Sequence, residues 1–312
     1  MLSSELKGKP IGVTVNRKNI VLWRNSGNEI IALKDRCPHR GYRLSKGTLC
    51  KSGIRCEYHG MVFNSLGQVA KSPPWDSLQE YNKIMVGKFR CFERSGLIWI
   101  MTDECLDGGM SSSVPDLGDP TYLIRKKVGC HVNVILENMF DVTHFSAVHN
   151  NSFSSSMPIS YEAVEFERTK SSFKMTYSIA ISASDGFKQF VGAGVSKADI
   201  IATYLPPYAQ VFEVRYNNGF SYKSIQAALP VDEENTNYFQ VGFLGDDINP
   251  ERKEYFHASD MKILEEDLAV MENVTGDPLS VISSEGRNMN LVSNKHLYEI
   301  LRILDPQKNI SS

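Results

Sequence analysis

Two short segments, each pairing a cysteine with a histidine, constrain this chain more than any other feature. They read CPHRG from Cys37 and CEYHG from Cys56. Thiolate sulfur and neutral imidazole nitrogen are strong ligands for zinc and iron, so four such side chains predict a metal site. The glycine that ends each segment permits a tight turn of the loop over that site. The candidate ligands are Cys37, His39, Cys56 and His59.

The division of these ligands between the two segments separates zinc from an iron–sulfur cluster. Zinc sites with two cysteines and two histidines usually take both cysteines from one segment and both histidines from the other. Here each segment supplies one of each. That division suits a two-iron cluster in which one iron takes both thiolates and the other takes both imidazoles, which is Rieske ligation. A zinc site is the alternative.

A second group of candidate ligands follows about eighty residues later, in LENMFDVTHFSAVHN. Asp141 and His144 are three residues apart and share a face if the segment is helical. His144 and His149 would lie about 140° apart on one regular helix. A bend or a helix end must therefore intervene before both imidazoles can reach one ion. Two histidines and a carboxylate form the facial triad of a mononuclear non-haem iron(II) site.

The missing carboxylate is expected in the late segment MKILEEDLAVMENV, which holds Glu265, Glu266 and Asp267. Helical periodicity places Asp267 on the apolar face with Leu264 and Met271, whereas both glutamates point elsewhere. A carboxylate on an apolar face is costly unless it binds a metal or forms a pair. We therefore predict Asp267 as the third ligand.

The first hundred residues are rich in β-branched and aromatic runs separated by turn residues. These runs are residues 11–15, 19–23, 29–33, 61–64 and 96–101. A stretch rich in Gly, Ser, Asp and Pro follows, DECLDGGMSSSVPDLGDP, and indicates a linker. We predict a first domain over residues 1–105, a linker over 106–120 and a second domain over 121–312.

The second domain alternates strand-like segments and closes with helices. Residues 130–134 read as a strand, and a helix is expected from about Ile135. An antiparallel meander and two closing helices, 251–274 and 293–304, follow. The expected fold class is α+β, with an all-β domain and then an antiparallel sheet surrounded by helices. The expected strands of the meander are residues 163–168, 172–182, 200–206, 209–216, 221–231 and 237–245.

Composition excludes several partners. The formal net charge is −2 and no long Lys/Arg block occurs, so neither nucleic acid nor an anionic membrane is favoured. The longest apolar runs fall short of the ~20 residues of a membrane helix. The first residues, MLSSELKGKP, lack the pattern of a signal peptide. Six cysteines among 312 residues form no disulfide scaffold, which favours the cytoplasm.

Over almost its whole length the chain resembles the Rieske-type non-haem iron oxygenases. The resemblance rests on the CPHRG and CEYHG segments, on ERSGLIWIM, on the N-x-x-D-x-x-H-x-x-x-x-H pattern from Asn138 and on the late acidic helix. Respiratory Rieske proteins carry an extra cysteine in each loop, where this chain has Tyr42 and Tyr58, so the oxygenase branch fits better. Met61 departs from the family, which usually has an aromatic residue there.

The resemblance implies a fold and an assembly. It implies a Rieske [2Fe-2S] domain followed by a helix-grip-like catalytic domain that holds Fe(2+). It also implies that Asp141 hydrogen-bonds His144 and, across a homotrimer interface, His59 of the partner subunit, so that electrons cross between subunits. A buried carboxylate of this kind orients both imidazoles. Asn138 is expected close to the iron.

The implied function is that of a terminal oxygenase that activates O2. The chain has no G-x-G-x-x-G segment, so NAD(P)H is expected to act only through a partner, a ferredoxin or a flavin reductase or both. The length is similar to that of homotrimeric monooxygenases and demethylases, which favours monohydroxylation or O/N-demethylation of a small or medium-sized organic substrate, such as an aromatic or heterocyclic compound. Phe140, Phe145 and strands within residues 200–245 are candidates for the pocket. The alternative is an electron-transfer or ligand-sensing Rieske protein without oxygenase activity.

Overall fold

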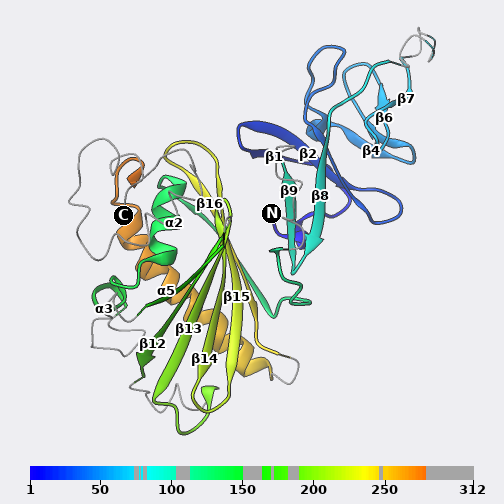
Figure 1. Ribbon diagram of the computed structural model, residues 1–312. Coiled ribbons are helices and arrows are strands. Elements are labelled where there is room, and N and C mark those ends of the chain that lie inside the picture. Colours follow the sequence, from blue (N-terminus) through cyan, green and yellow to red (C-terminus); the bar gives the residue numbers. More distant parts are fainter. Residues whose placement is uncertain are drawn as a thin grey trace. The chain divides into compact units, whose positions relative to one another are not determined.

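The computed structural model describes residues 1–73, 77, 79, 83–102, 113–149, 164–169, 172–181, 190–245 and 249–278. The chain divides into two compact units, Met1–Gly118 and Asp119–Ser312 (Figure 1). The expected helix over 293–304 and residues 106–112 of the expected linker lie outside the described residues, and the domain limits stay a prediction. In the described part of the chain, no helix is both long enough and apolar enough to span a membrane.

The first unit is built from two antiparallel sheets, as the predicted all-β domain requires. One has the strand order β1-β2-β3-β8-β9 and the other β4-β5-β6-β7. The first sheet contains β1 (Ile11–Val15), β2 (Lys18–Arg24), β3 (Ile30–Lys34), β8 (Lys88–Arg94) and β9 (Leu97–Met101). The second contains β4 (Thr48–Cys50), β5 (Gly53–Arg55), β6 (Val62–Phe63) and β7 (Val69–Lys71). Short 3-10 turns, η1 (Ser3–Glu5) and η2 (Leu44–Lys46), complete the described elements of this unit.

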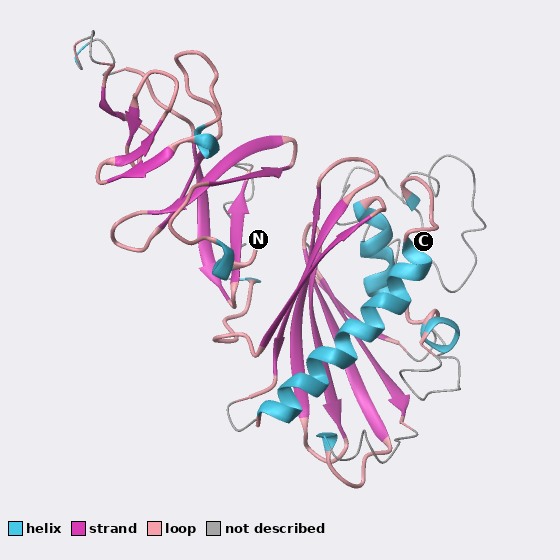
Figure 2. Cartoon of the chain, turned by 180° about the vertical axis from the view of Figure 1, so that it is seen from behind, coloured by secondary structure: helices cyan, strands magenta, loops and turns pink. Residues whose placement is uncertain are grey.

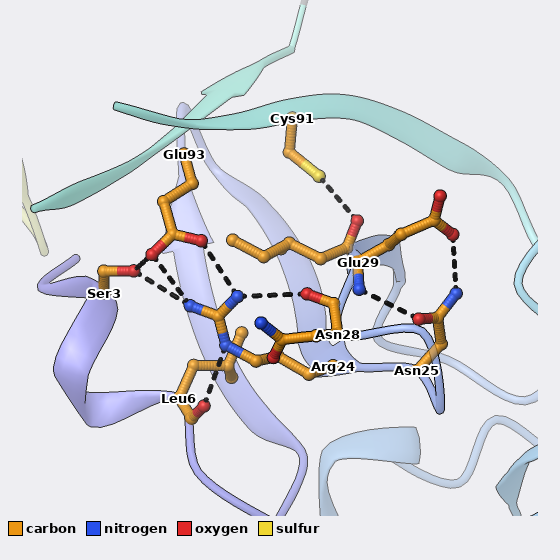
Figure 3. Close-up of polar contacts among 9 residues, drawn as sticks. Ser3, Leu6, Arg24, Asn25, Asn28, Glu29, Cys91 and Glu93 are labelled. Atoms are coloured by element: carbon orange, nitrogen blue, oxygen red, sulfur yellow. Dashed lines mark hydrogen bonds and ion pairs between the residues drawn. The ribbon is translucent and has the colours of Figure 1, made fainter. Parts of the chain in front are cut away.

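Polar contacts around Arg24 fasten the N-terminal segment to this unit (Figure 3). The two terminal nitrogens of Arg24, on β2, each lie 2.9 Å from a carboxylate oxygen of Glu93, on β8. The same guanidinium donates to the carbonyl of Leu6 at 3.3 Å and to the hydroxyl of Ser3 at 2.9 Å. The Ser3 hydroxyl in turn donates to Glu93. The Arg24 side chain thus connects β2 to η1 and to β8, a strand that is not its neighbour in the sheet.

The Arg24–Glu93 pair predicts a pH-dependent loss of stability. The hydrogen bond from Arg24 holds the pKa of Glu93 below its ordinary value of 4.5. A lowered carboxyl pKa stabilises the fold above the unfolded-state pKa, and this contribution is lost as the pH falls through the folded-state pKa. Because the Glu93 side chain is 43% exposed, Glu93→Gln should lower the free energy of unfolding by only about 0.5–1 kcal/mol near pH 7.

Urea titrations of both proteins from about pH 7 to about pH 3.5 measure this difference. The gap between wild type and Glu93→Gln should narrow below pH 4.5, where the unfolded-state carboxyl becomes protonated. If the difference in the free energy of unfolding stays constant over this pH range, the variant loses stability through packing and not through the charge of Glu93.

The second unit contains one seven-stranded antiparallel sheet with the strand order β10-β16-β15-β14-β13-β12-β11. All six predicted strands of the meander are present. Strand β10 is an addition to the prediction, because its sequence YLIRKKV contains three consecutive basic residues and so lacks an evident apolar strand pattern. The strands are β10 (Tyr122–Val128), β11 (Glu165–Arg168), β12 (Phe173–Ala180), β13 (Lys197–Leu205), β14 (Ala209–Tyr216), β15 (Ser221–Pro230) and β16 (Thr236–Phe243).

Helices α2 (Val132–Phe140) and α5 (Pro250–Met271) lie on the same face of this sheet (Figure 2). The α+β prediction is confirmed, although the described long helices cover one face and do not surround the sheet. Helix α2 begins before Ile135, because the His131 side chain caps it by accepting from the Asn133 amide at 3.2 Å. The strand expected over residues 130–134 is therefore wrong.

Candidate functional site

The two Cys/His segments form loops with the same backbone hydrogen bonds. In the first loop, the Cys37 amide donates to the carbonyl of Tyr42 at 2.8 Å, and the Gly41 amide donates to the carbonyl of Cys37 at 2.9 Å. The second loop repeats both bonds at the same spacing from Cys56, again at 2.8 and 2.9 Å. Gly41 and Gly60 have φ angles of 75° and 73°, which strongly favour glycine at both turns.

The repeated loops bring the four candidate cluster ligands together. Cys37 and Cys56 are buried, and the ring centroids of His39 and His59 are 4.5 Å apart. Burial, together with the neighbouring Cys56 thiol, raises the pKa of Cys37 to about 11. Nδ1 of His39 is buried and has no hydrogen-bond partner in the described part of the chain. Two buried thiols, one of them with a raised pKa, and an imidazole nitrogen without a hydrogen-bond partner fit a [2Fe-2S] cluster, whose iron would bind and stabilise the thiolates.

Two tyrosines stand at the loop positions where a disulfide would be needed in a respiratory Rieske protein. The ring centroids of Tyr42 and Tyr58 are 6.3 Å apart. Tyr58 also stacks on His59 with a centroid distance of 3.9 Å and remains 59% exposed. The tyrosine therefore supports the outer face of one candidate ligand without enclosing it.

No regular helix runs through both histidines of the second group, because one helix ends before His144 and the next single turn ends at His149. Helix α2 ends at Phe140, and a single turn, α3 (Phe145–Val148), follows with His144 and His149 at its two ends. Asp141 caps α2 and so lies in the turn between the helices, not on a continuous helix with His144.

The carboxylate of Asp141 has one oxygen fixed locally and one directed to the histidine. Its Oδ1 accepts from the amide of Thr143 at 2.7 Å and from the Thr143 hydroxyl at 2.6 Å. Its Oδ2 lies 3.7 Å from Nδ1 of His144, which is longer than a hydrogen bond. Nδ1 of His144 is buried with no hydrogen-bond partner among the described residues. The structure thus places Asp141 beside His144 without a direct hydrogen bond between them.

Asp267, from α5, meets both histidines. Its Oδ1 is 3.1 Å from Nε2 of His149 and 3.5 Å from Nε2 of His144. The side-chain amide of Asn138 donates to the same oxygen at 3.1 Å. In the described part of the chain, one group of three His, Cys, Asp or Glu residues has ligand atoms that all lie within 4.8 Å of one another. It consists of His144, His149 and Asp267. Two nitrogens and one carboxylate at this spacing suit one metal ion.

Glu266 also belongs to this group, although helical periodicity directs it elsewhere. Its Oε2 lies 2.9 Å from Nδ1 of His149, whose side chain is 1% exposed. The expectation that Glu266 points away is therefore wrong, because the direction of the Cβ atom does not fix where a long side chain ends. Glu265 does point away and lies 3.8 Å from Lys126.

The carboxylates give the site a negative potential. Burial works to lower the pKa of His149, but the hydrogen bonds to Asp267 and Glu266 outweigh it and raise the pKa overall. Groups that stabilise a positive charge on an imidazole equally stabilise a metal cation bound to it. The residues present therefore fit a divalent ion such as Fe(2+).

The site opens into a cavity between the helices and the sheet. Phe145 lines the cavity, as expected, but Phe140 packs in the core, with its ring centroid 4.9 Å from that of Phe173. Strands β14, β15 and β16 supply the far wall. Sequence reasoning missed the polar residues of this cavity, which are Gln210, Ser224, Gln226, Gln240 and Asp260.

A period-two signal could have found the polar residues that lie on the strands. Gln210 and Phe212 face the cavity from β14, and Ser224 and Gln226 face it from β15, each two positions apart. Polar side chains on the buried face of a strand are unusual unless they bind something. The other histidines outside the site have local contacts: His131 caps α2, and the His257 ring centroid lies 5.6 Å from that of Tyr122. His296 lies outside the described residues.

Comparison with known proteins identifies both units. Residues 1–82 match the Rieske [2Fe-2S] domain, and residues 128–305 match the vanillate O-demethylase oxygenase C-terminal domain. The oxygenase component of dicamba O-demethylase from Stenotrophomonas maltophilia is 33% identical over 47% of this chain and 45% of its own length. Methylxanthine N1-demethylase NdmA from Pseudomonas putida is 25% identical over 74% of this chain and 66% of its own.

A solved structure gives the same result for the fold. The crystal structure of apo dicamba monooxygenase is similar with a TM-score of 0.76, 21% identity, and coverage of 98% of this chain and 94% of that one. In sequence, the chain spans about half the length of the first curated relatives that it matches, 51% and 45%. The second domain match covers more than half of the chain and adjoins a Rieske domain match. The chain therefore belongs to the Rieske non-haem iron oxygenases.

Proposed function

We propose that this protein is the terminal oxygenase of a multicomponent Rieske system and that it monohydroxylates or O/N-demethylates a small organic substrate. One observation carries the proposal: two imidazole Nε2 atoms and the Asp267 carboxylate converge where the cavity begins. A protein that only relays electrons needs the Cys/His loops but has no use for this second group. The names of the relatives, which include an O-demethylase and an N1-demethylase, support the reaction class.

The proposed ligands follow from the geometry. Cys37 and Cys56 would bind one iron of the cluster, and His39 and His59 the other. His144, His149 and Asp267 would bind the mononuclear iron, which supplies O2 activation when it is bound. Asn138 fixes the Asp267 carboxylate, and Glu266 fixes the ring of His149 so that Nε2 faces the site.

The proposed electron path depends on a second copy of the chain. Asp141 holds one oxygen through Thr143 and directs the other to His144. In a homotrimer, the same carboxylate would contact His59 of the partner subunit and so join a cluster to a mononuclear iron. A ferredoxin or a flavin reductase would deliver electrons from NAD(P)H. Five described cysteines without a disulfide support a reducing, cytoplasmic setting.

Turnover of a substrate panel tests the function. The protein receives NADH through a surrogate ferredoxin and flavin reductase, together with methoxylated and N-methylated aromatic compounds. For O-demethylation, substrate, O2, NADH and a proton yield the phenol, formaldehyde, water and NAD+, so formaldehyde should match the NADH consumed. A cluster that is reduced while the whole panel yields no product would favour the electron-transfer or ligand-sensing alternative.

Asp141→Asn tests the proposed bridge. The substitution keeps the shape of the side chain but removes its charge, so both metal sites should fill normally. Turnover should fall by at least about a hundredfold, because transfer between cluster and iron depends on this carboxylate. Asp199→Asn is the control, since that side chain is 47% exposed and far from the described site residues in sequence. Wild-type turnover in Asp141→Asn would contradict the bridge.

Glu266→Gln tests the support of His149. Loss of this charge should weaken Fe(2+) binding by about 10- to 100-fold, the usual effect of removing a partner of a metal-binding histidine. Titration of the apo mononuclear site with Fe(2+) measures the affinity, and the visible absorption of the cluster serves as an internal reference. Glu265→Gln is the matched control, because Glu265 is 63% exposed and contacts Lys126. Equal Fe(2+) affinities of the two variants would show that Glu266 does not support metal binding.

A further inference from the structure

Three glutamines form a row across the cavity wall. Gln210 on β14 pairs in register with Gln226 on β15, and Gln226 pairs with Gln240 on β16. All three line the cavity. The amide of Gln210 donates to Oε1 of Gln226 at 2.7 Å. Gln240 accepts from the Tyr238 hydroxyl at 2.7 Å.

Two atoms of this wall are buried without a partner in the described part of the chain. They are Oε1 of Gln210 and the hydroxyl oxygen of Ser224. Gln210 is 1% exposed and Ser224 is 0% exposed. The register neighbours of Ser224 are Phe212 and Gly242, which offer no side-chain partner. A buried polar atom without a hydrogen bond is costly, so such atoms in a cavity wall point to a ligand that satisfies them.

The charge of the wall limits what that ligand can be. Asp260 lines the cavity and accepts from the Tyr122 hydroxyl and from the Gln240 amide. Burial raises its pKa to about 6, so the carboxylate is still mostly ionised near pH 7.5. Among the described residues that line the cavity, none is a lysine or an arginine. An anionic group placed against this wall would meet the Asp260 carboxylate, with no lysine or arginine among the described lining residues to offset that charge.

The distance between this wall and the metal ligands sets the size of the ligand. Asp260 and Asp267 lie on the same helix, α5, seven residues apart. Two helical turns separate their backbones by about 10 Å along the axis. Apolar side chains also line the cavity, among them Leu264, Phe145 and Met139. One aromatic or heterocyclic ring with a substituent at each end spans this length.

We propose that the substrate is an uncharged planar compound with an amide-type edge, whose N–H donates to Gln210 Oε1 and whose carbonyl accepts from the Ser224 hydroxyl. This inference rests on the proposed function, because it concerns the substrate of the same site. The edge that binds Gln210 and Ser224 is opposite the group that is oxidised. The same wall disfavours aromatic carboxylates.

A matched pair of probes tests the substrate class without turnover. 4-Methoxybenzamide and 4-methoxybenzoate have the same shape and differ in charge and in the N–H donors. Calorimetric titration of the anaerobic holoenzyme should show the amide binding at least about tenfold more tightly. Ser224→Ala should weaken amide binding by about three- to tenfold, and the weaker benzoate binding by no more than this. Ser221→Ala, an exposed serine on the same strand, should change neither.

The variants separate recognition from folding. Ser224→Ala removes an unpaired buried hydroxyl, so its Tm should equal or exceed that of wild type, whereas a merely structural role for the hydroxyl would lower it. Gln210→Leu is the second variant and should lower the ratio of amide affinity to benzoate affinity. Benzoate binding as tightly as the amide, no amide binding, or full amide affinity in folded Ser224→Ala would each overturn the substrate class.

The binding data and the turnover data fail independently. A protein that binds the amide with the predicted preference but yields no oxidised product overturns the oxygenase proposal and leaves the substrate class standing. A protein that demethylates 4-methoxybenzoate and not 4-methoxybenzamide overturns the substrate class and leaves the oxygenase proposal standing.

Discussion

The carboxylate of Asp267 is the contact on which the second unit depends. It lies on the inner side of α5 and is held by three side chains, from Asn138 on α2 and from His144 and His149 at the two ends of α3. A buried carboxylate is unfavourable without such partners. Helix α2 near its end, and α3 at both of its ends, therefore contact α5 at this carboxylate.

Helix α5 carries two chemistries on one face. The inner face of the helix carries the buried Asp260 and, two turns later, Asp267, whose side chain is 13% exposed. The first is held by neutral donors from the sheet, Tyr122 and Gln240, and the second by imidazoles. Asp260, with neutral hydrogen-bond donors around it, is part of the cavity wall. Asp267 lies beside two imidazoles and can bind a metal ion together with them. The same helix thus sets both the proposed reaction site and, about 10 Å away, the proposed specificity of the cavity.

The sequence predicts the parts of this account that depend on spacing. The Cys/His segments and the histidine group stand out because their residue types are rare and regularly placed, and periodicity selects Asp267. It does not select Glu266, whose contact depends on the reach of a long side chain. Asp260 lies one heptad before Asp267 on the same stripe and could have been found by extending the periodicity. Strand β10 was missed because its outward face is basic, and the helix cap at His131 has no distinctive sequence pattern.

The central claim is that one chain holds both a cluster and a separate mononuclear iron. Iron and acid-labile sulfide, measured on the same purified sample, test it most directly. The wild type should contain about three irons and two sulfides per chain, and His144→Ala about two irons and two sulfides, with the visible absorption of the cluster retained. Two irons and two sulfides in a fully loaded wild-type protein, or loss of the cluster's colour in His144→Ala, would contradict two independent metal sites.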